Sequence, residues 1–142
     1  MSMNQKMKYP RMKKSLFLLL TGCCLLSGWG CSSRNPTDVA AQVAKQNYDN
    51  LLKGKYDAFV DAFYRQDEIP DSYREQLVVN MKMFMNQQQR EHRGVKETRV
   101  VNAKMGESGR EANVFLALCY GDSTTEEICV PMVLSDGIWY LR

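Results

Sequence analysis

The hydrophobic pattern of the chain changes once, at Gly94, and this change limits the folds that the chain can adopt. Between residues 35 and 92, apolar side chains recur every three or four positions, which is typical of helices that bury one face. Between residues 95 and 141 they alternate, and β-branched residues become frequent, as in half-buried strands. Helices followed by a run of strands predict an α+β domain with one hydrophobic core.

Two short helices are expected first. An asparagine cap at Asn35 and a first-turn proline at Pro36 indicate where the first helix begins. Gly54 favours a left-handed reversal and should end it. The second helix is expected over residues 56–64, where an aromatic-rich stripe repeats at helical spacing: Tyr56, Phe59, Val60, Phe63 and Tyr64.

A third helix is expected after the break at residues 67–70. Asp71 or Ser72 can cap it, and a cation at His92 followed by Gly94 suits its C-terminal end. One side of this helix carries the residues expected to be buried, which are Tyr73, Leu77, Met81, Phe84 and Met85.

Four strands are expected after Gly94, and short turns between them make the sheet antiparallel. The apolar faces of the two middle strands align only if the residue numbers of two facing residues differ by an even number. A loop at residues 122–124 and a loop at residues 122–126 both meet this condition. A weaker apolar set lies on the outer sheet face, which a homodimer partner could cover, although partial exposure is ordinary there. The expected strands are residues 95–104, 112–121, 127–134 and 138–141, and the outer set is Phe115, Ala117 and Val133.

The first thirty residues have the organisation of an export signal. Five Lys and Arg precede an apolar run at residues 16–26, which is shorter than the about 20 residues that a membrane span needs. The run is followed by Cys31 and a polar tether, as in bacterial lipoproteins. We therefore predict a signal peptide at residues 1–30, a lipidated tether at 31–35 and one domain at 36–142. We expect an outer-membrane anchor, and the lack of acidic residues just after Cys31 favours a domain that faces the periplasm over one on the cell surface.

Two cysteines compete for the lipid. The segment that ends at Cys23 has the better local resemblance to a lipobox, but it leaves only about seven residues after Lys14 for the apolar region. Cys31 gives a better apolar length and a Cys-Ser-Ser start, so we favour Cys31 and keep Cys23 as the alternative.

Removal of the signal reverses the net charge of the protein. Five of the nineteen Lys and Arg lie in the signal, so residues 31–142 carry fourteen of them against all sixteen Asp and Glu, a net charge of −2 instead of +3. Such a surface has no basic stripe to neutralise phosphates, and we therefore expect no binding to nucleic acid.

The order of elements over residues 36–142 resembles the nuclear-transport-factor-2-like (cystatin-like) fold, a cone in which a curved antiparallel sheet wraps a helix. Four segments resemble bacterial lipoproteins of domain of unknown function 4878, namely LKGKYDAF (52–59), DSYREQL (71–77), VPMV (130–133) and DGIW (136–139). The resemblance implies an apolar cavity between helices and sheet, which relatives use for small-molecule binding, for isomerisation or dehydration, or for dimerisation. These motifs contain packing and turn residues without a catalytic signature.

Six aromatic residues are candidates for lining such a pocket, although helical spacing alone predicts that most of them belong to the core. They are Tyr48, Tyr56, Phe59, Phe63, Tyr120 and Trp139.

Catalytic and metal-binding groups are not predicted. Asp57 and Asp61 lie opposite the aromatic stripe and should be exposed, and the single histidine, His92, suits a helix end. Cys119 and Cys129 are too far apart for a zinc knuckle, and we expect neither a metal nor a cofactor. The two cysteines would face each other and could form a disulfide with a five-residue loop, whereas a three-residue loop places Cys119 opposite Glu127.

The sequence therefore predicts a lipid-anchored module that binds a small apolar ligand or a protein partner. The alternatives are a cavity enzyme of the isomerase or dehydratase type and a purely structural assembly protein.

Overall fold

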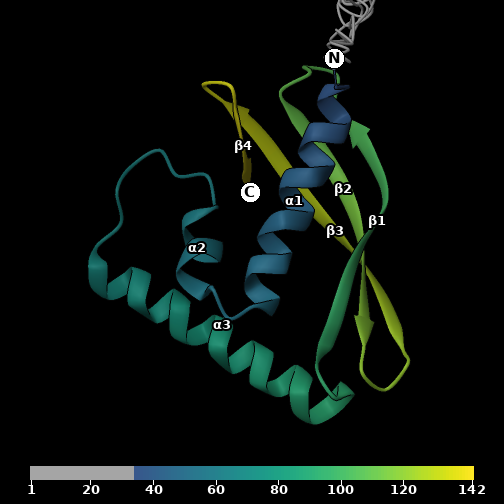
Figure 1. Ribbon diagram of the computed structural model, residues 1–142. Coiled ribbons are helices and arrows are strands. Elements are labelled where there is room, and N and C mark those ends of the chain that lie inside the picture. Colours follow the sequence, from purple (N-terminus) through teal and green to yellow (C-terminus); the bar gives the residue numbers. More distant parts are fainter. Residues whose placement is uncertain (1–33) are drawn as a thin grey trace, which may run out of the picture. The chain divides into compact units, whose positions relative to one another are not determined.

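The computed structural model describes residues 34–142, which form three helices and one antiparallel sheet (Figure 1). The expected signal peptide, Cys23 and Cys31 lie outside the described residues. None of the helices in residues 34–142 has the length and hydropathy of a membrane span. The elements are α1 (Pro36–Leu52), α2 (Tyr56–Asp61), α3 (Asp71–His92), β1 (Val95–Met105), β2 (Glu111–Tyr120), β3 (Thr125–Ser135) and β4 (Ile138–Leu141).

Each strand pairs with its neighbour in sequence, in the order β1-β2-β3-β4. Val114 lies opposite Val130, so the apolar faces of β2 and β3 align with the even separation that the pattern predicts. The loop is nevertheless one residue earlier than either predicted loop start. The backbone N–H of Tyr120 donates to the carbonyl of Thr124 at 2.9 Å, which leaves residues 121–123 as the loop and lets β3 begin at Thr125.

Helix α1 lies across the inner face of the sheet (Figure 1). It presents alanines there, and small side chains let the helix backbone approach the strands closely. The residues of this contact are at most 4% exposed: Ala40, Ala41, Ala44, Val114, Leu116, Val130 and Met132. The core of the domain is therefore the layer between α1 and the sheet.

A polar contact joins α1 to β1 at the edge of this layer. The hydroxyl of Thr98, which is completely buried, donates to the carboxylate of Asp49, and the ammonium of Lys45 lies 2.6 Å from the same carboxylate. Burial raises the pKa of Asp49, but the hydrogen bonds from Lys45 and Thr98 outweigh it and the pKa is lowered overall. The buried hydroxyl is thus satisfied, as a polar group in a core must be.

Helix α2 lies between α1 and α3 and ends at Asp61, three residues earlier than predicted. The backbone after it pairs with β4 instead of continuing the helix. The N–H of Leu141 donates to the carbonyl of Ala62 at 2.9 Å, and the N–H of Tyr64 donates to the carbonyl of Leu141 at 2.7 Å. These bonds hold Phe63 beside Leu141 in an isolated parallel bridge.

Helix α3 differs from its prediction at its start and on its surface. Pro70 occupies the N-cap position without a side-chain cap, so neither Asp71 nor Ser72 is the cap. The helix ends at His92 as predicted. Tyr73 and Phe84, which were expected to be buried, are 54% and 38% exposed. Because α3 packs mainly against α2 and the start of β1, its outer side has no neighbour to cover it.

Candidate functional site

Two adjoining depressions between α2 and α3 form the candidate site, which we call the α2–α3 cleft. Its apolar part has a volume of about 280 Å³, and its acidic part has a volume of about 670 Å³. Phe63, Tyr64 and Arg65 line both parts and join them. The other residues of the apolar part are Phe59, Val60, Tyr73, Leu77 and Met81.

The apolar part of the cleft follows from the early end of α2. Phe59 on the helix and Phe63 just after it meet edge to face, with ring centroids 5.5 Å apart. The pairing with β4 turns the chain so that Tyr64 lies at the edge of the cleft, and α3 supplies Tyr73 on the other side. Tyr64 is 38% exposed and Tyr73 is 54% exposed. Two large aromatic surfaces are therefore uncovered around a small apolar depression.

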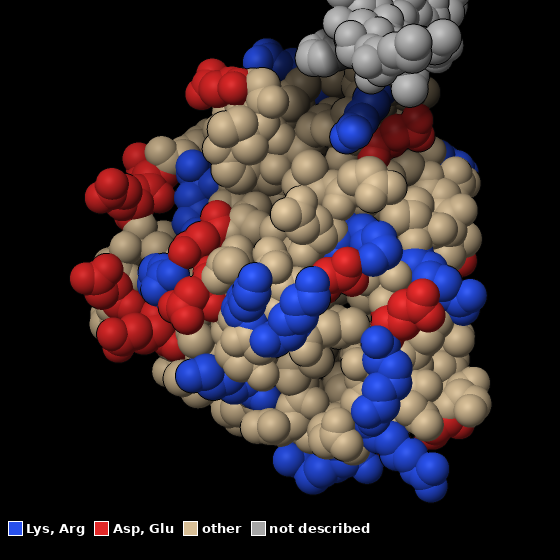
Figure 2. Space-filling model, viewed as in Figure 1, with Lys and Arg blue, Asp and Glu red and all other residues tan. Residues whose placement is uncertain are grey.

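The acidic part collects carboxylates from four places in the chain, the first of which is the end of α2 at Asp61. Asp67 and Glu68 belong to the loop between α2 and α3 (residues 62–70), Asp71 begins α3, and Asp136 lies in the β3–β4 turn. Figure 2 shows Asp and Glu side chains gathered at the side of the molecule where this loop lies. With Asp61, five carboxylates and two guanidiniums line this part, a net of three negative charges.

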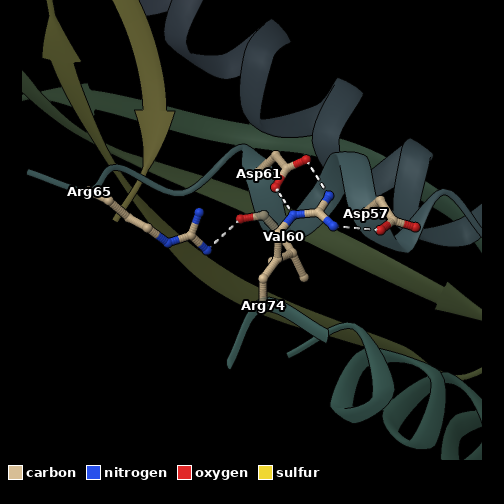
Figure 3. A network of polar contacts seen from close by, with 5 residues as sticks. All are labelled: Asp57, Val60, Asp61, Arg65 and Arg74. Atoms are coloured by element: carbon tan, nitrogen blue, oxygen red, sulfur yellow. Dashed lines mark hydrogen bonds and ion pairs between the residues drawn. The ribbon is translucent and has the colours of Figure 1, made fainter. Parts of the chain in front are cut away.

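The two guanidiniums are already engaged by partners within the domain (Figure 3). Arg74 of α3 binds both carboxylate oxygens of Asp61 at 2.6 and 2.7 Å, and its third donor reaches Asp57 at 3.0 Å. The hydrogen bond from Arg74 is the main cause of the lowered pKa of Asp61. Arg65 donates to the carbonyl of Val60 at 2.7 Å.

The remaining carboxylates of the cleft are not neutralised by an ion pair in this way. Within residues 34–142, none of the ion pairs includes Asp67, Glu68, Asp71 or Asp136. The arginines thus fix α3 against α2, while four carboxylates face solvent at the cleft.

The structure places five of the six predicted pocket aromatics in or against the hydrophobic core, and Tyr120 outside it, so they do not line one pocket. Phe59 and Phe63 line the cleft, and Tyr48 packs edge to face on Phe59 with centroids 5.3 Å apart. Tyr56 is half-buried, Trp139 is buried in the core, and Tyr120 lies where β2 ends. The α1 alanines and their strand neighbours fill the space between α1 and the central strands, where the resemblance implied a cavity.

The sequence reasoning did not identify Tyr64, Tyr73 and the acids of the α2–α3 loop as site residues. Their signal was present, because two aromatic residues flank a run that contains Asp67, Glu68 and Asp71. Only the fold shows that this run lines a depression that adjoins the apolar part of the cleft.

The candidate acid–base residues, Asp57, Asp61 and His92, do not lie together in one site. The side chains of Asp57 and Asp61 are 69% and 52% exposed, as expected, and both pair with Arg74. His92 lies fifteen residues beyond Leu77 on α3, which is about 20 Å at the rise of an α-helix. Its Nδ1 lies 2.9 Å from a carboxylate oxygen of Asp122, and its ring packs on that of Tyr120 with centroids 4.6 Å apart.

His92 belongs to a contact that ties the end of α3 to the β2–β3 loop. The N–H of Asp122 donates to the carbonyl of His92 at 3.0 Å, and the N–H of Gly121 donates to the carbonyl of Gly94 at 2.9 Å. A Cβ on Gly121 would lie 2.5 Å from the carbonyl oxygen of Arg93, so this approach requires glycine. Burial and the hydrogen bond to Glu126 raise the pKa of Tyr120 to about 12.

This contact predicts a pH-dependent contribution to stability. Hydrogen bonds from Thr124, and then from His92, lower the pKa of Asp122 from its ordinary value of 3.8 to about 2. Its stabilising effect is therefore complete above pH 4 and is lost as the pH falls toward 2. In urea unfolding, the free energy of unfolding of Asp122→Asn should be lower than that of the wild type at pH 6.5, and the difference between them should shrink at pH 2. Glu107→Gln, an exposed acid in the β1–β2 turn, is the control, and an equal Asp122→Asn gap at both pH values would contradict the role of the carboxylate.

The structure corrects the possible disulfide between Cys119 and Cys129. Cys119 lies opposite Thr125 and Cys129 lies opposite Phe115, so the thiols are four ladder positions apart. Both cysteines are free, and the guanidinium of Arg99 donates to the sulfur of Cys119 at 3.2 Å. The earlier loop excludes both alignments that the sequence left open.

Residues 34–142 contain no group of three or more His, Cys, Asp or Glu side chains arranged to hold a metal ion. The carboxylates of the cleft provide a negatively charged surface.

Comparison with solved structures identifies the fold. A Campylobacter jejuni crystal structure, provisionally named an NTF2-like transpeptidase, superposes with a TM-score of 0.57 at 14% identity, covering 75% of this chain and 96% of that one. A SEC-C motif containing protein from Rhodopseudomonas palustris matches with a TM-score of 0.46 at 16% identity, covering 72% of this chain and 76% of that one. No protein-family model and no curated protein matches the chain significantly.

The first of these likenesses confirms the predicted α+β class and the NTF2-like fold. At this level of identity it shows the fold alone. Proteins with one fold serve different functions, so the fold is compatible with a ligand-binding module and with an enzyme.

Proposed function

We propose that the protein is a lipid-anchored binding protein of the bacterial cell envelope, and that its α2–α3 cleft receives an apolar group of a ligand or partner. The observation that carries this proposal is the apolar depression of about 280 Å³ with Tyr64 and Tyr73 uncovered beside it. Aromatic side chains around a concave apolar surface are the usual lining of binding sites. Burying them against a ligand would remove this surface from water.

A binding role explains the site better than catalysis in a cavity. General acid–base catalysis needs a titratable group held within reach of the substrate by apolar walls. Here Asp61 is half-exposed and engaged by Arg74, and His92 lies at the far end of α3. The apolar part of the cleft is lined by hydrocarbon and aromatic side chains together with Arg65, whose charge is directed at the carbonyl of Val60.

The proposed anchor is consistent with access to the cleft. Only Ser32 and Ser33 separate Cys31 from the described domain, so a lipid on Cys31 would attach at the N-terminal end of α1. Helix α1 has 17 residues and is therefore about 25 Å long, and α3 lies at its opposite end (Figure 1). This arrangement would leave α3 and its side of the cleft open to the periplasm.

Titration with a neutral apolar dye, Nile red, tests the binding role of the cleft. We expect saturable fluorescence enhancement with the domain of residues 34–142 and a loss of at least tenfold in affinity in Leu77→Trp. The larger indole fills the apolar part, whereas Leu77 is half-buried at its wall and leaves room for the change. Val101→Trp, at an exposed position of β1, is the matched control and should bind like the wild type.

Circular dichroism and thermal melts of both variants verify that they are folded. Equal dye affinity in wild type and Leu77→Trp would mean that the dye binds elsewhere, and absence of saturable binding to the wild type would remove the proposed role of the cleft.

A further inference from the structure

We infer that the occupant of the α2–α3 cleft is a basic peptide segment of a partner protein. The segment would place one aromatic or aliphatic side chain in the apolar part and lysines or arginines along the acidic part. This inference rests on the proposed binding function of the cleft and adds the chemistry of the ligand.

Charge complementarity is the first argument. The acidic part carries three more negative than positive charges, although the whole of residues 34–142 carries only two more. The imbalance of the domain is thus concentrated at this site. Asp67, Glu68 and Asp71 lie within five residues of one another, and Asp136 adds a fourth carboxylate from the β3–β4 turn.

The state of the two arginines strengthens this argument. Arg74 is held by Asp57 and Asp61, and Arg65 is held by the carbonyl of Val60. Neither can swing toward the other acids without giving up these bonds. A ligand that brings its own cations would find unpaired carboxylates, whereas phosphates and anionic lipid headgroups would be repelled. A membrane surface is therefore a poor occupant.

The dimensions of the cleft favour a peptide over an enclosed small molecule. The apolar part, at about 280 Å³, is just below the range of typical small-ligand pockets and suits one large side chain. The acidic part, at about 670 Å³, extends from α3 to the β3–β4 turn. Interfaces commonly use one buried anchor with a charged rim, and an extended segment satisfies both parts at once.

Fluorescence anisotropy with labelled heptapeptides tests the inference on residues 34–142. The probe is a peptide with a central phenylalanine flanked by lysines, and the comparison peptides replace either the phenylalanine by alanine or the lysines by glutamates. We expect saturable binding of the probe alone, weakened at least tenfold between 50 and 300 mM NaCl because salt screens charge pairs. Equal binding of the glutamate peptide would overturn the inference.

Neutralising the acids locates the binding. The triple variant Asp67→Asn, Glu68→Gln, Asp71→Asn should weaken probe binding at least tenfold while Nile red binding persists. The control Glu97→Gln, Glu107→Gln, Glu127→Gln removes three charges from exposed positions outside the cleft, and its affinity should stay within twofold of the wild type. Equal weakening in both variants would show a general charge effect and would overturn the inference.

Two further outcomes separate this inference from the proposed function. If Nile red binds in the cleft and the probe peptide does not bind, the inference of a basic peptide is overturned and the proposed function stands. If neither the dye nor the peptide binds, the cleft is not a binding site. Analytical ultracentrifugation addresses a second copy of the chain as the occupant. Self-association that the triple cleft variant abolishes would overturn the inference in favour of assembly.

Discussion

Replacing Cys31 with serine is expected to move most of the protein from the membrane to the soluble fraction. A lipoprotein cysteine carries several acyl chains, and each buried methylene contributes about 0.8 kcal/mol to membrane binding, so the loss of all chains leaves no anchor. The described domain has no helix that could replace it. Ultracentrifugation of cell lysates followed by immunoblotting measures the distribution, and labelling with radioactive palmitate reports the acylation.

Cys23→Ser is the matched control, because it removes the alternative cysteine and should leave the protein acylated in the membrane. Acyl label that persists in Cys31→Ser and disappears in Cys23→Ser would assign the lipid to Cys23. Since the α2–α3 cleft lies within residues 34–142, the released Cys31→Ser protein should still bind Nile red with unchanged affinity.

Local periodicity predicted the elements of the domain and most of their ends. The helical spacing before Gly94 and the alternation after it correspond to three helices and four strands. The end of α3 was predicted because its signals are local: Arg93 adopts a left-handed conformation with φ of 60°, followed by Gly94 with φ of 81°. Caps and turns depend on neighbouring residues and can therefore be found in a sequence.

Contacts between residues far apart in the sequence explain the predictions that were wrong. The apolar stripe after Tyr56 would allow a longer helix, but Ala62 and Tyr64 hydrogen bond with Leu141, almost eighty residues further along the chain. Likewise, alternation predicts which residues share a face of the sheet. Several placements of the β2–β3 loop keep these faces aligned, so alternation does not decide between them. The β2–β3 loop took residues 121–123, and this choice separated Cys119 from Cys129.

The site was harder to predict than the fold because its residues come from separate parts of the sequence and meet only in the folded chain. Phe59 and Phe63 were candidates for pocket lining, and they line the apolar part. Periodicity placed Tyr73 on a buried side, but it does not reveal whether that side meets a partner. The approach of Asp136 to the α2–α3 loop depends on where the β3–β4 turn ends, which the sequence pattern does not specify.

Truncating Leu116 to alanine should destabilise the domain by about 3 kcal/mol, within the range for a large-to-small change in a packed core. Leu116 is completely buried in β2. It belongs to the core cluster with the alanines of α1, such as Ala40 and Ala44. Alanines have no rotamers with which to fill a void, so the cavity should persist and the full cost should be felt. A loss of this size lowers the melting temperature of a domain of about 110 residues by about 10–20 °C.

Val101→Ala is the control for this change, because Val101 is 53% exposed at a register shift of β1 and its truncation should alter the free energy of unfolding by at most about 0.5 kcal/mol. Urea unfolding of both variants gives the two free energies, and an unchanged slope with urea shows that each variant unfolds from the same compact state. If Leu116→Ala cost no more than Val101→Ala, α1 would not pack on the sheet as described. A cost near 3 kcal/mol would instead show that the packing of α1 on the sheet makes a large contribution to the stability of the domain.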